Sequence, residues 1–361
     1  MLKRLLCLLL VLTLVPTTLA LAAETVLVDE KDRKIELNGR QADGNFPTNM
    51  VLLGESPTTG LPWEGDYMPM LVQIDNTDGG VDKIAPWGAR YTDIVYETPL
   101  YSVGSTRISF LFSDHVPDSA GPVRSARVGH VWLREEWDAG FLYYGGQEAE
   151  GTSINKEFSK YKATKKGVLF SGIVSTSKPW KKYYTRVKGL SNPHNVDANV
   201  AAMRDLIPET HVAPDRPYLF TDVLPTTGEA ATSITLGWKH KDYVSTFTYN
   251  ADKNCYTRTV HGVPYVDSQT GEQLEFANLI VQRTKVRYYG GHSDRPILSN
   301  VGQGNADIFM GGRYIAGYWI RTAMDQRTIF FDENGNELEL QRGKTYIAMP
   351  DSNVPVTYSA D

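Results

Sequence analysis

The hydrophobic pattern of this chain changes character once, and that change limits the folds it can adopt. From Met68 to about residue 220, short apolar runs typical of buried strands alternate with segments whose apolar residues recur at helical spacing. After about Pro225 the runs are short and strand-like, and turn residues separate them. We therefore expect an α/β N-terminal domain, with an open mixed sheet and helices, followed by a mainly antiparallel all-β C-terminal domain.

The expected elements follow from this pattern. Strands are predicted at 70–75, 93–100, 107–113 and 141–144, and helices at 125–137 and 198–207. Asp197 stands where it could cap the second helix. In the C-terminal half, Asn334-Gly335 between two apolar runs is the strongest hairpin signal, and Gly311-Gly312 marks another turn. The domains are predicted at 63–220 and 233–352, with a stretch of Pro, Thr, Gly and Ala between them.

The N-terminus has the features of a secretory signal peptide. Lys3 and Arg4 precede an apolar run at 5–15, and Ala20-Leu21-Ala22 offers small residues for cleavage. The run is shorter than the roughly 20 residues that a membrane-spanning helix needs, although an uncleaved anchor is the alternative. We predict a signal peptide at 1–22, an extended lead-in at 23–62, and a secreted or wall-associated protein outside the cytoplasm.

Cysteine usage agrees with a fold that is stable without disulfides. Cys7 lies inside the apolar run, too early to be the lipid-modified cysteine of a lipobox. Removal of the signal peptide leaves Cys255, which has no second cysteine to pair with. Cys255 lies in a strand-like run with no recognisable nucleophile signature, so we interpret it as a passive thiol.

The net charge of the chain argues against one class of binding partner, nucleic acid. The formal charge of −5 argues against a general nucleic-acid binder, because no broad basic face would compensate phosphate repulsion. Small basic clusters occur at 162–166 and at Lys181-Lys182, and we interpret them as solvated surface, with contact to an anionic wall polymer as the alternative.

A set of short motifs resembles the YerB-type lipoprotein family of bacteria, a two-domain family of unknown function. The resemblance covers about residues 60–350, and Gly121-Pro122-Val123-Arg124-Ser125-Ala126-Arg127 is its most specific part. The resemblance implies a cell-envelope protein with the domain division given above, and it implies no reaction. The chain departs from the family in having no lipobox cysteine, which favours release or retention by the wall. The other motifs are Ile74-Asp75-Asn76, Asp93-Ile94-Val95-Tyr96-Glu97, Thr106-Arg107, Asp267 with Thr270-Gly271, Asn278-Leu279-Ile280-Val281-Gln282, Val301-Gly302-Gln303-Gly304 and the Gly-Lys-Thr-Tyr-Ile run that ends at Ile347.

The N-terminal half places arginines and acids where a ligand would bind. Ligands of open α/β sheets bind beyond the carboxyl ends of the strands, and the loop at 121–127 leads into a predicted helix there. Helix N-termini and guanidinium groups both favour anions. We expect an anion-binding pocket formed by Arg107, Arg124, Arg127 and Asn76, with Asp75 and Glu97 orienting the arginines or acting as acid and base. The alternative is an arginine–carboxylate network that only holds the loops to the sheet.

His194 is a further candidate, because a histidine in a Ser191–Asn195 loop can act as a general base or, as the alternative, bind a divalent cation together with Asp75 and Glu97. The catalytic candidates are therefore Asp75, Glu97 and His194. No HxH, HExxH or CxxC spacing occurs in the sequence, so neither a metal nor a cofactor is expected.

The function that these observations favour is binding of an anionic ligand of the cell envelope, such as a wall glycan, a peptide stem or a phosphate polymer. The alternatives are a hydrolase or transferase that acts on cell-wall material, and a scaffold that docks a protein partner through the β domain. No nucleic-acid partner is expected, and membrane attachment is expected only through an uncleaved signal segment.

Overall fold

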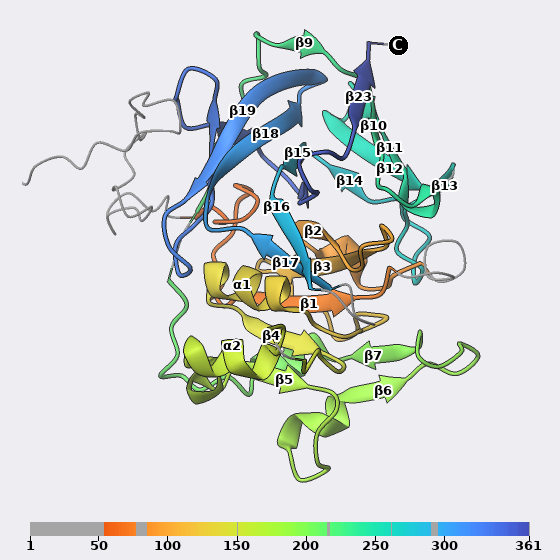
Figure 1. The fold of residues 1–361 in the computed structure, drawn as a ribbon, viewed down its shortest axis with the longest axis vertical. Helices are drawn as coiled ribbons and strands as arrows, with labels where there is room; N and C mark the ends of the chain where they lie inside the picture. The colour runs from red at the N-terminus through yellow and green to blue at the C-terminus, as the bar shows by residue number, and fades with distance from the viewer. Residues whose placement is uncertain are drawn as a thin grey trace, which may run out of the picture.

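The fold is a large mixed sheet with a second sheet packed on one face and the two longer α-helices on the other (Figure 1). The structure, a computed structural model, describes residues 54–76, 85–149, 151–214, 217–260, 262–289 and 295–360. The predicted signal peptide and most of the predicted lead-in lie outside these residues. No helix in the described ranges is both long and apolar enough to cross a membrane.

The central sheet contains 11 strands, ten of them in the order β20-β19-β18-β15-β22-β2-β3-β1-β4-β5, and β9 (Glu229–Ala230) pairs with β19 off this path. From the N-terminal half come β1 (Met70–Ile74), β2 (Ile94–Pro99), β3 (Thr106–Phe112), β4 (Gly140–Tyr143) and β5 (Leu169–Ser171). From the C-terminal half come β15 (Asn278–Gln282), β18 (Gly302–Met310), β19 (Arg313–Arg321), β20 (Ile329–Asp332) and β22 (Thr345–Ala348).

One strand pair joins the two halves of the chain. β22 pairs in parallel with β2 on one side and with β15 on the other, so that Tyr96 lies beside Ile347. The structure therefore does not confirm an α/β domain separate from an all-β domain, because both halves contribute to one sheet. Local hydrophobic patterns could not reveal a pairing between segments some 250 residues apart in sequence. The boundaries at 220 and 233 stay a prediction.

A smaller, antiparallel sheet comes from the C-terminal half alone. Its order is β13-β12-β11-β10-β23, and β14 pairs with β12. Its strands are β10 (Ser233–Leu236), β11 (Ser245–Asn250), β12 (Cys255–Val260), β13 (Val263–Pro264), β14 (Glu275–Phe276) and β23 (Val356–Ser359). Three two-stranded pairs complete the fold: β16 (Lys285–Tyr289) with β17 (Arg295–Ser299), β6 (Tyr184–Arg186) with β7 (Val196–Ala198), and β8 (Leu219–Thr221) with β21 (Glu339–Gln341).

The described α-helices all lie in the N-terminal half. They are α1 (Val128–Trp137), α2 (Ile154–Lys160) and α3 (Val200–Arg204), and short 3-10 helices occur at Ala89–Tyr91, Ala163–Lys166, Pro179–Tyr183 and Lys241–Tyr243. The cap of α3 is Asn199, whose side chain accepts from the backbone N–H of Ala202, and the prediction of Asp197 was wrong. Asp197 instead accepts hydrogen bonds from Trp87 and Ser119.

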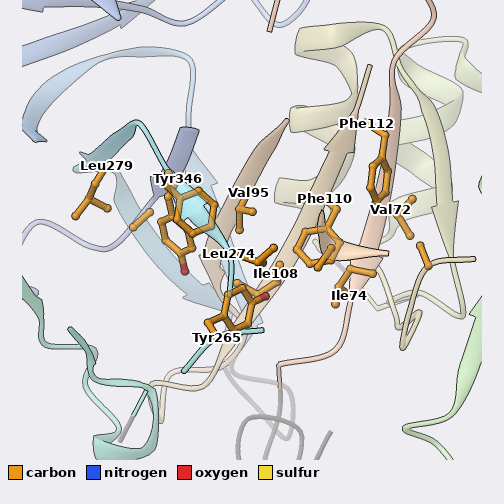
Figure 2. Packing of buried hydrophobic residues seen from close by; sticks show 14 of the residues in the cluster. Val72, Ile74, Val95, Ile108, Phe110, Phe112, Tyr265, Leu274, Leu279 and Tyr346 are labelled. Atoms are coloured by element: carbon orange, nitrogen blue, oxygen red, sulfur yellow. The ribbon is translucent and has the colours of Figure 1, made fainter. Parts of the chain in front are cut away.

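Alternation along the central strands divides the core into two layers. Val72, Ile74, Val95, Ile108 and Phe110 lie on the face that meets the second sheet, in one cluster with Tyr265, Leu274 and, from β22 of the same central sheet, Tyr346 (Figure 2). On the opposite face, neighbours of these residues pack on the apolar sides of α1 and α2. Burial of each such side chain contributes about 1.5–3 kcal/mol, so both faces of the central strands are fixed firmly.

The end of the predicted lead-in is not extended. Residues 54–62 form a tight loop in which Glu55 bridges Pro62 and Gly60 donates to the carbonyl of Ser56. The carboxylate of Asp114 holds this loop, because it accepts from the hydroxyl groups of Ser56 and Thr59 at 2.6 and 2.8 Å. Ser56 and Thr59 are therefore buried, although no local pattern predicted an ordered loop here.

Candidate functional site

The candidate site lies where β1 ends, β3 begins and two loops meet. The backbone N–H of Asp75 donates to the carbonyl of Pro122, and the N–H of Arg124 donates to that of Gln73, so the loop at 121–127 lies along the end of β1. The N–H of Val123 donates to the carbonyl of Val196, which brings the loop at 191–195 alongside. The Gly121–Pro122 and Asn192–Pro193 peptide bonds are cis. Segments far apart in sequence thus present their side chains at one place.

The carboxylate of Asp75 is the centre of this arrangement. Its Oδ1 lies 3.1 Å from Nη1 of Arg107, and its Oδ2 lies 3.1 Å from Nε of Arg124 and 2.5 Å from Nδ1 of His194. The side chain of Asp75 is fully buried, whereas those of Arg124 and His194 are 22% and 21% exposed. Two of the partners of this buried carboxylate therefore reach solvent.

Arg127 and Arg295 enlarge the positive charge. The guanidinium of Arg127 donates to the carbonyl of Ala126 and to the hydroxyl of Tyr101. Burial lowers the pKa of Arg127 to about 10, and the charges of Arg107 and Arg295 add to this effect. Burial also lowers the pKa of Arg107, with a contribution from the charge of Arg124. The guanidinium groups of Arg107, Arg124, Arg127 and Arg295 are therefore close enough for their charges to repel one another.

We call Arg107, Arg124, Arg127 and Arg295 the arginine cluster. Among the described residues, Asp75 is the one carboxylate that forms an ion pair with any of them. Arg127 is also the N-cap of α1, so the positive end of the helix dipole adds to the field of the cluster. In the part of the chain that the structure describes, the cluster therefore combines four guanidinium groups with one paired carboxylate.

The hydrogen-bonding capacity of the arginine cluster is not used up. In the described structure, the Nε atom of each of the four arginines is buried without a hydrogen-bond partner. For Arg124 this holds although Asp75 is close, because the 3.1 Å ion pair has poor hydrogen-bond geometry. Buried unpaired N–H groups are uncommon in folded proteins, and each calls for an explanation.

His130 holds the backbone of Arg127 in place by a hydrogen bond. Its Nδ1 accepts from the backbone N–H of Arg127 at 3.0 Å, so Nε2 carries the proton and donates to Thr98. Burial, together with the charges of Arg107 and Arg127, holds the pKa of His130 well below its usual value. His130 is therefore neutral, and it fixes the start of α1 without adding charge.

Glu97 and Asn76 do not belong to this site. Glu97 accepts from Thr106 and Tyr346 at 2.7 and 2.6 Å and pairs with Arg258 at 3.4 Å, on the face of the sheet that meets the second sheet. Asn76 donates to Thr106 on the same face. The expectation that Glu97 and Asn76 join the arginines was wrong, because alternation along β2 and β3 turns these side chains away from Arg107.

The described part of the chain contains neither a candidate metal site nor a reactive thiol. Within the described residues, no group of three or more His, Cys, Asp or Glu side chains could hold a metal ion. Cys255 is buried, and burial raises the pKa of its thiol to about 11. A protonated thiol is a poor nucleophile, as we expect for a passive cysteine.

Three further residues belong to the site and were not predicted from the sequence: Tyr101, His130 and Arg295. The His130 signal was available, because a histidine three residues after a loop arginine can cap a helix start. Arg295 had no local signal, since it comes from β17 in the other half of the chain.

The comparisons with known proteins agree with this fold. Residues 58–213 match the N-terminal domain, and residues 234–347 the C-terminal domain, of a family described as protein of unknown function (DUF3048). A relative from Bacillus subtilis (strain 168), named "Putative lipoprotein YerB", is 25% identical over 303 residues, which are 81% of this chain and 85% of the relative. The crystal structure of YerB protein from Bacillus subtilis matches with a TM-score of 0.68 and 21% identity, covering 84% of this chain and 99% of that one.

Proposed function

The chain belongs to the YerB-like family that carries the two DUF3048 domains, and from that premise we propose that it is a cell-envelope protein that binds an anionic, wall-associated ligand through its arginine cluster. The single observation that carries the proposal is the imbalance of charge at the site. Four guanidinium groups gather there, while one described carboxylate, Asp75, pairs with them.

The chemistry of the cluster favours a phosphate or carboxylate group as the ligand. Guanidinium groups match both anions with paired N–H donors, and N–H groups of the cluster have no partner in the described structure. An incoming anion would supply the acceptor and the counter-charge together. Arg124 is the member through which the ligand makes first contact, because its side chain is partly exposed.

The extracytoplasmic location rests on two independent features. The N-terminus has the pattern of a signal peptide, and the Bacillus subtilis relative bears a lipoprotein name. A lipoprotein is attached outside the cytoplasm, where the anionic polymers of the wall are found.

The contact between Asp75 and His194 favours a second candidate function, a hydrolase or transferase that acts on wall material. A carboxylate bound to Nδ1 orients an imidazole so that Nε2 can accept a proton from a substrate or water. Glu97 is not available as the second acid, because it lies on the other face of the sheet. Asp75 and His194 alone would act in this mechanism.

Inorganic phosphate and purified cell walls test the binding function. We expect phosphate to raise the melting temperature of the protein and the walls to retain it, with retention falling as salt rises. Arg124→Ala should remove both effects. Arg342→Ala is the matched control, because the side chain of Arg342 is also 22% exposed and ion-paired. Retention that survives Arg124→Ala and Arg127→Ala would refute the proposal.

A substitution at His194 separates the two candidate functions. His194→Gln should leave wall retention intact if the site only binds. If the site is catalytic, His194→Gln should abolish release of soluble wall fragments while retention persists.

A further inference from the structure

The segment at 158–196 has a charge unlike that of the rest of the chain. It contains nine Lys and Arg residues and no Asp or Glu, although the chain as a whole carries a formal charge of −5. It forms the end of α2, β5, β6 and the 3-10 helix at Pro179–Tyr183, which lie together at the lower end of the molecule (Figure 1). We call this segment the basic lobe.

Cations and aromatic rings alternate on the basic lobe. Lys181 Nζ and Arg186 Cζ each lie 5.4 Å from the ring centroid of Tyr144. Lys178 lies 5.4 Å from Trp180, and Lys182 lies 4.9 Å from the ring of Tyr183. Such contacts fix the positions of long cationic side chains while leaving their charge in place.

Most cations of the lobe have no carboxylate partner among the described residues. Lys166 pairs with Asp138 at 2.7 Å. Among the residues that the structure describes, however, no carboxylate forms an ion pair with Lys178, Lys181, Lys182, Arg186 or Lys188. Arg186 instead donates to the side-chain oxygens of Asn192 and Asn195.

The basic lobe adjoins the arginine cluster. The ring of Tyr144 contacts both Lys181 and Arg186. The backbone N–H of Tyr144 donates to the carbonyl of Arg124. Arg186 bonds Asn195, the neighbour of His194, which contacts Asp75. The cations therefore form a continuous track from Arg124, past Tyr144, to the 3-10 helix at Pro179–Tyr183.

We propose that the ligand is an extended phosphate-bearing polymer, with one phosphate held by the arginine cluster and the next ones lying along the track of Arg186, Lys181 and Lys178. This inference rests on the proposed function and specifies its ligand class. A small anion would occupy the cluster and leave the track unused. A polymer with regularly spaced charges uses both, and rings such as Tyr144 offer apolar contact between the phosphates.

The surface fits a polymer better than an anionic membrane. The aromatic rings of the track are half-buried, and Trp180 is held by a hydrogen bond from Nε1 to the carbonyl of Ser171, so they do not protrude to enter a bilayer. The exposed large aliphatic side chains that the structure describes in the lobe are two, Ile173 at 64% and Val187 at 37%, among nine Lys and Arg residues. Membrane-surface segments instead present a continuous apolar face.

The test compares binding of inorganic phosphate, tripolyphosphate and long-chain polyphosphate to the full-length protein at several salt concentrations. The track variant is Lys181→Gln with Arg186→Gln. The control is Lys241→Gln with Arg313→Gln, which removes the same charges from places far from the lobe. Anionic phosphatidylglycerol vesicles form a separate arm.

We expect long-chain polyphosphate to bind more tightly per phosphate than tripolyphosphate and with a steeper salt dependence. The track variant should lose about tenfold in long-chain affinity and about 1.4 in the log–log salt slope, because two phosphate contacts disappear. Its binding of inorganic phosphate should not change, and the control should behave like the unaltered protein.

The outcomes separate this inference from the proposed function. Equal affinity per phosphate for short and long chains, or equal losses in the track and control variants, would overturn the track and leave the cluster in place. Long-chain binding that depends on the track but survives Arg124→Ala would support the track and overturn the cluster as its anchor. Vesicle binding through the same cations, with no binding of polyphosphate, would overturn the polymer in favour of a membrane.

Discussion

Asp75 and Glu97 lie on opposite faces of the central sheet, Asp75 directly after β1 and Glu97 within β2. Ile74, Ile108 and Glu97 occupy one row across β1, β3 and β2, so Asp75, one residue further along, faces the other way. Asp75 consequently meets Arg107 and Arg124, while Glu97 meets Arg258. Two buried carboxylates that look alike in sequence therefore have different partners and should respond differently to substitution.

Asp75→Asn should change stability and anion affinity in opposite directions. The substitution removes the carboxylate that forms ion pairs with Arg107 and Arg124 in the described structure. Loss of one partner of a buried ion pair lowers the free energy of unfolding by about 3–5 kcal/mol. The free guanidinium groups should then hold phosphate more tightly than in the unaltered protein. Urea unfolding with and without phosphate measures both effects, and a variant that loses stability without gaining phosphate affinity would contradict the prediction.

Glu97→Gln should destabilise the protein by about 3–5 kcal/mol without affecting anion binding. It leaves Arg258 charged and fully buried, and that arginine donates to Ser245 but has an unpaired Nη1. Combining it with Arg258→Met should recover part of the loss, because no buried charge then lacks a partner. Denaturant titration of the single and double variants checks this, and weakened phosphate binding in Glu97→Gln would show that the two faces are coupled.

His130 should make the folded state less stable in mild acid. Its pKa is lowered in the folded state by burial and by Arg107 and Arg127, so below about pH 6.5 the unfolded chain binds a proton that the folded chain does not. The free energy of unfolding should therefore fall by about 1.4 kcal/mol per pH unit between the unfolded and folded pKa values. Above about pH 6.5 His130 is neutral in both the folded and the unfolded chain, and the free energy of unfolding is not reduced by its protonation.

His130→Gln keeps a donor and an acceptor and removes the titration. The unfolding free energies of the unaltered protein and of His130→Gln should be measured from about pH 7.5 to about pH 5.5. The difference between them should become smaller as the pH falls. Parallel curves for the two proteins would exclude His130 as the source of acid sensitivity.

Ile347→Ala should destabilise both halves of the chain together. Ile347 is fully buried on β22, between β2 and β15, and truncation of such a side chain costs about 2–5 kcal/mol. Fluorescence and far-UV circular dichroism should report one transition that shifts as a unit. Thr357→Ala, at an exposed position of β23, should shift it little, and two separate transitions would mean that the shared sheet does not couple the halves.

Local signals predicted much of the secondary structure. The expected strands at 70–75, 93–100, 107–113 and 141–144 correspond to β1 to β4, and α1 lies within the helix expected at 125–137. Gly311-Gly312 does connect β18 to β19. Each of these features is encoded within about a dozen consecutive residues, where side-chain periodicity and turn chemistry act directly.

The Asn334-Gly335 turn shows where local signals stop. The turn forms, with Gly335 donating to the carbonyl of Asp332, and Phe331 bridges Glu337. β21 then leaves β20 and pairs in parallel with β8, more than 100 residues earlier in the chain. A turn sets the direction of the chain over a few residues, but the partner of the following strand depends on which edge and which apolar surface are free.

The sequence by itself determined where most strands and α1 lie, that the loop at 121–127 carries arginines, and that no intramolecular disulfide follows removal of the predicted signal peptide. The tertiary structure alone decided that β22 joins the two halves, that Glu97 turns away from Asp75, and that Arg295 and His194 come to the same place. The physical reason is that periodicity and turn chemistry are short-range properties. Strand partners and the face of each side chain depend on long-range register, which a shift of one residue reverses.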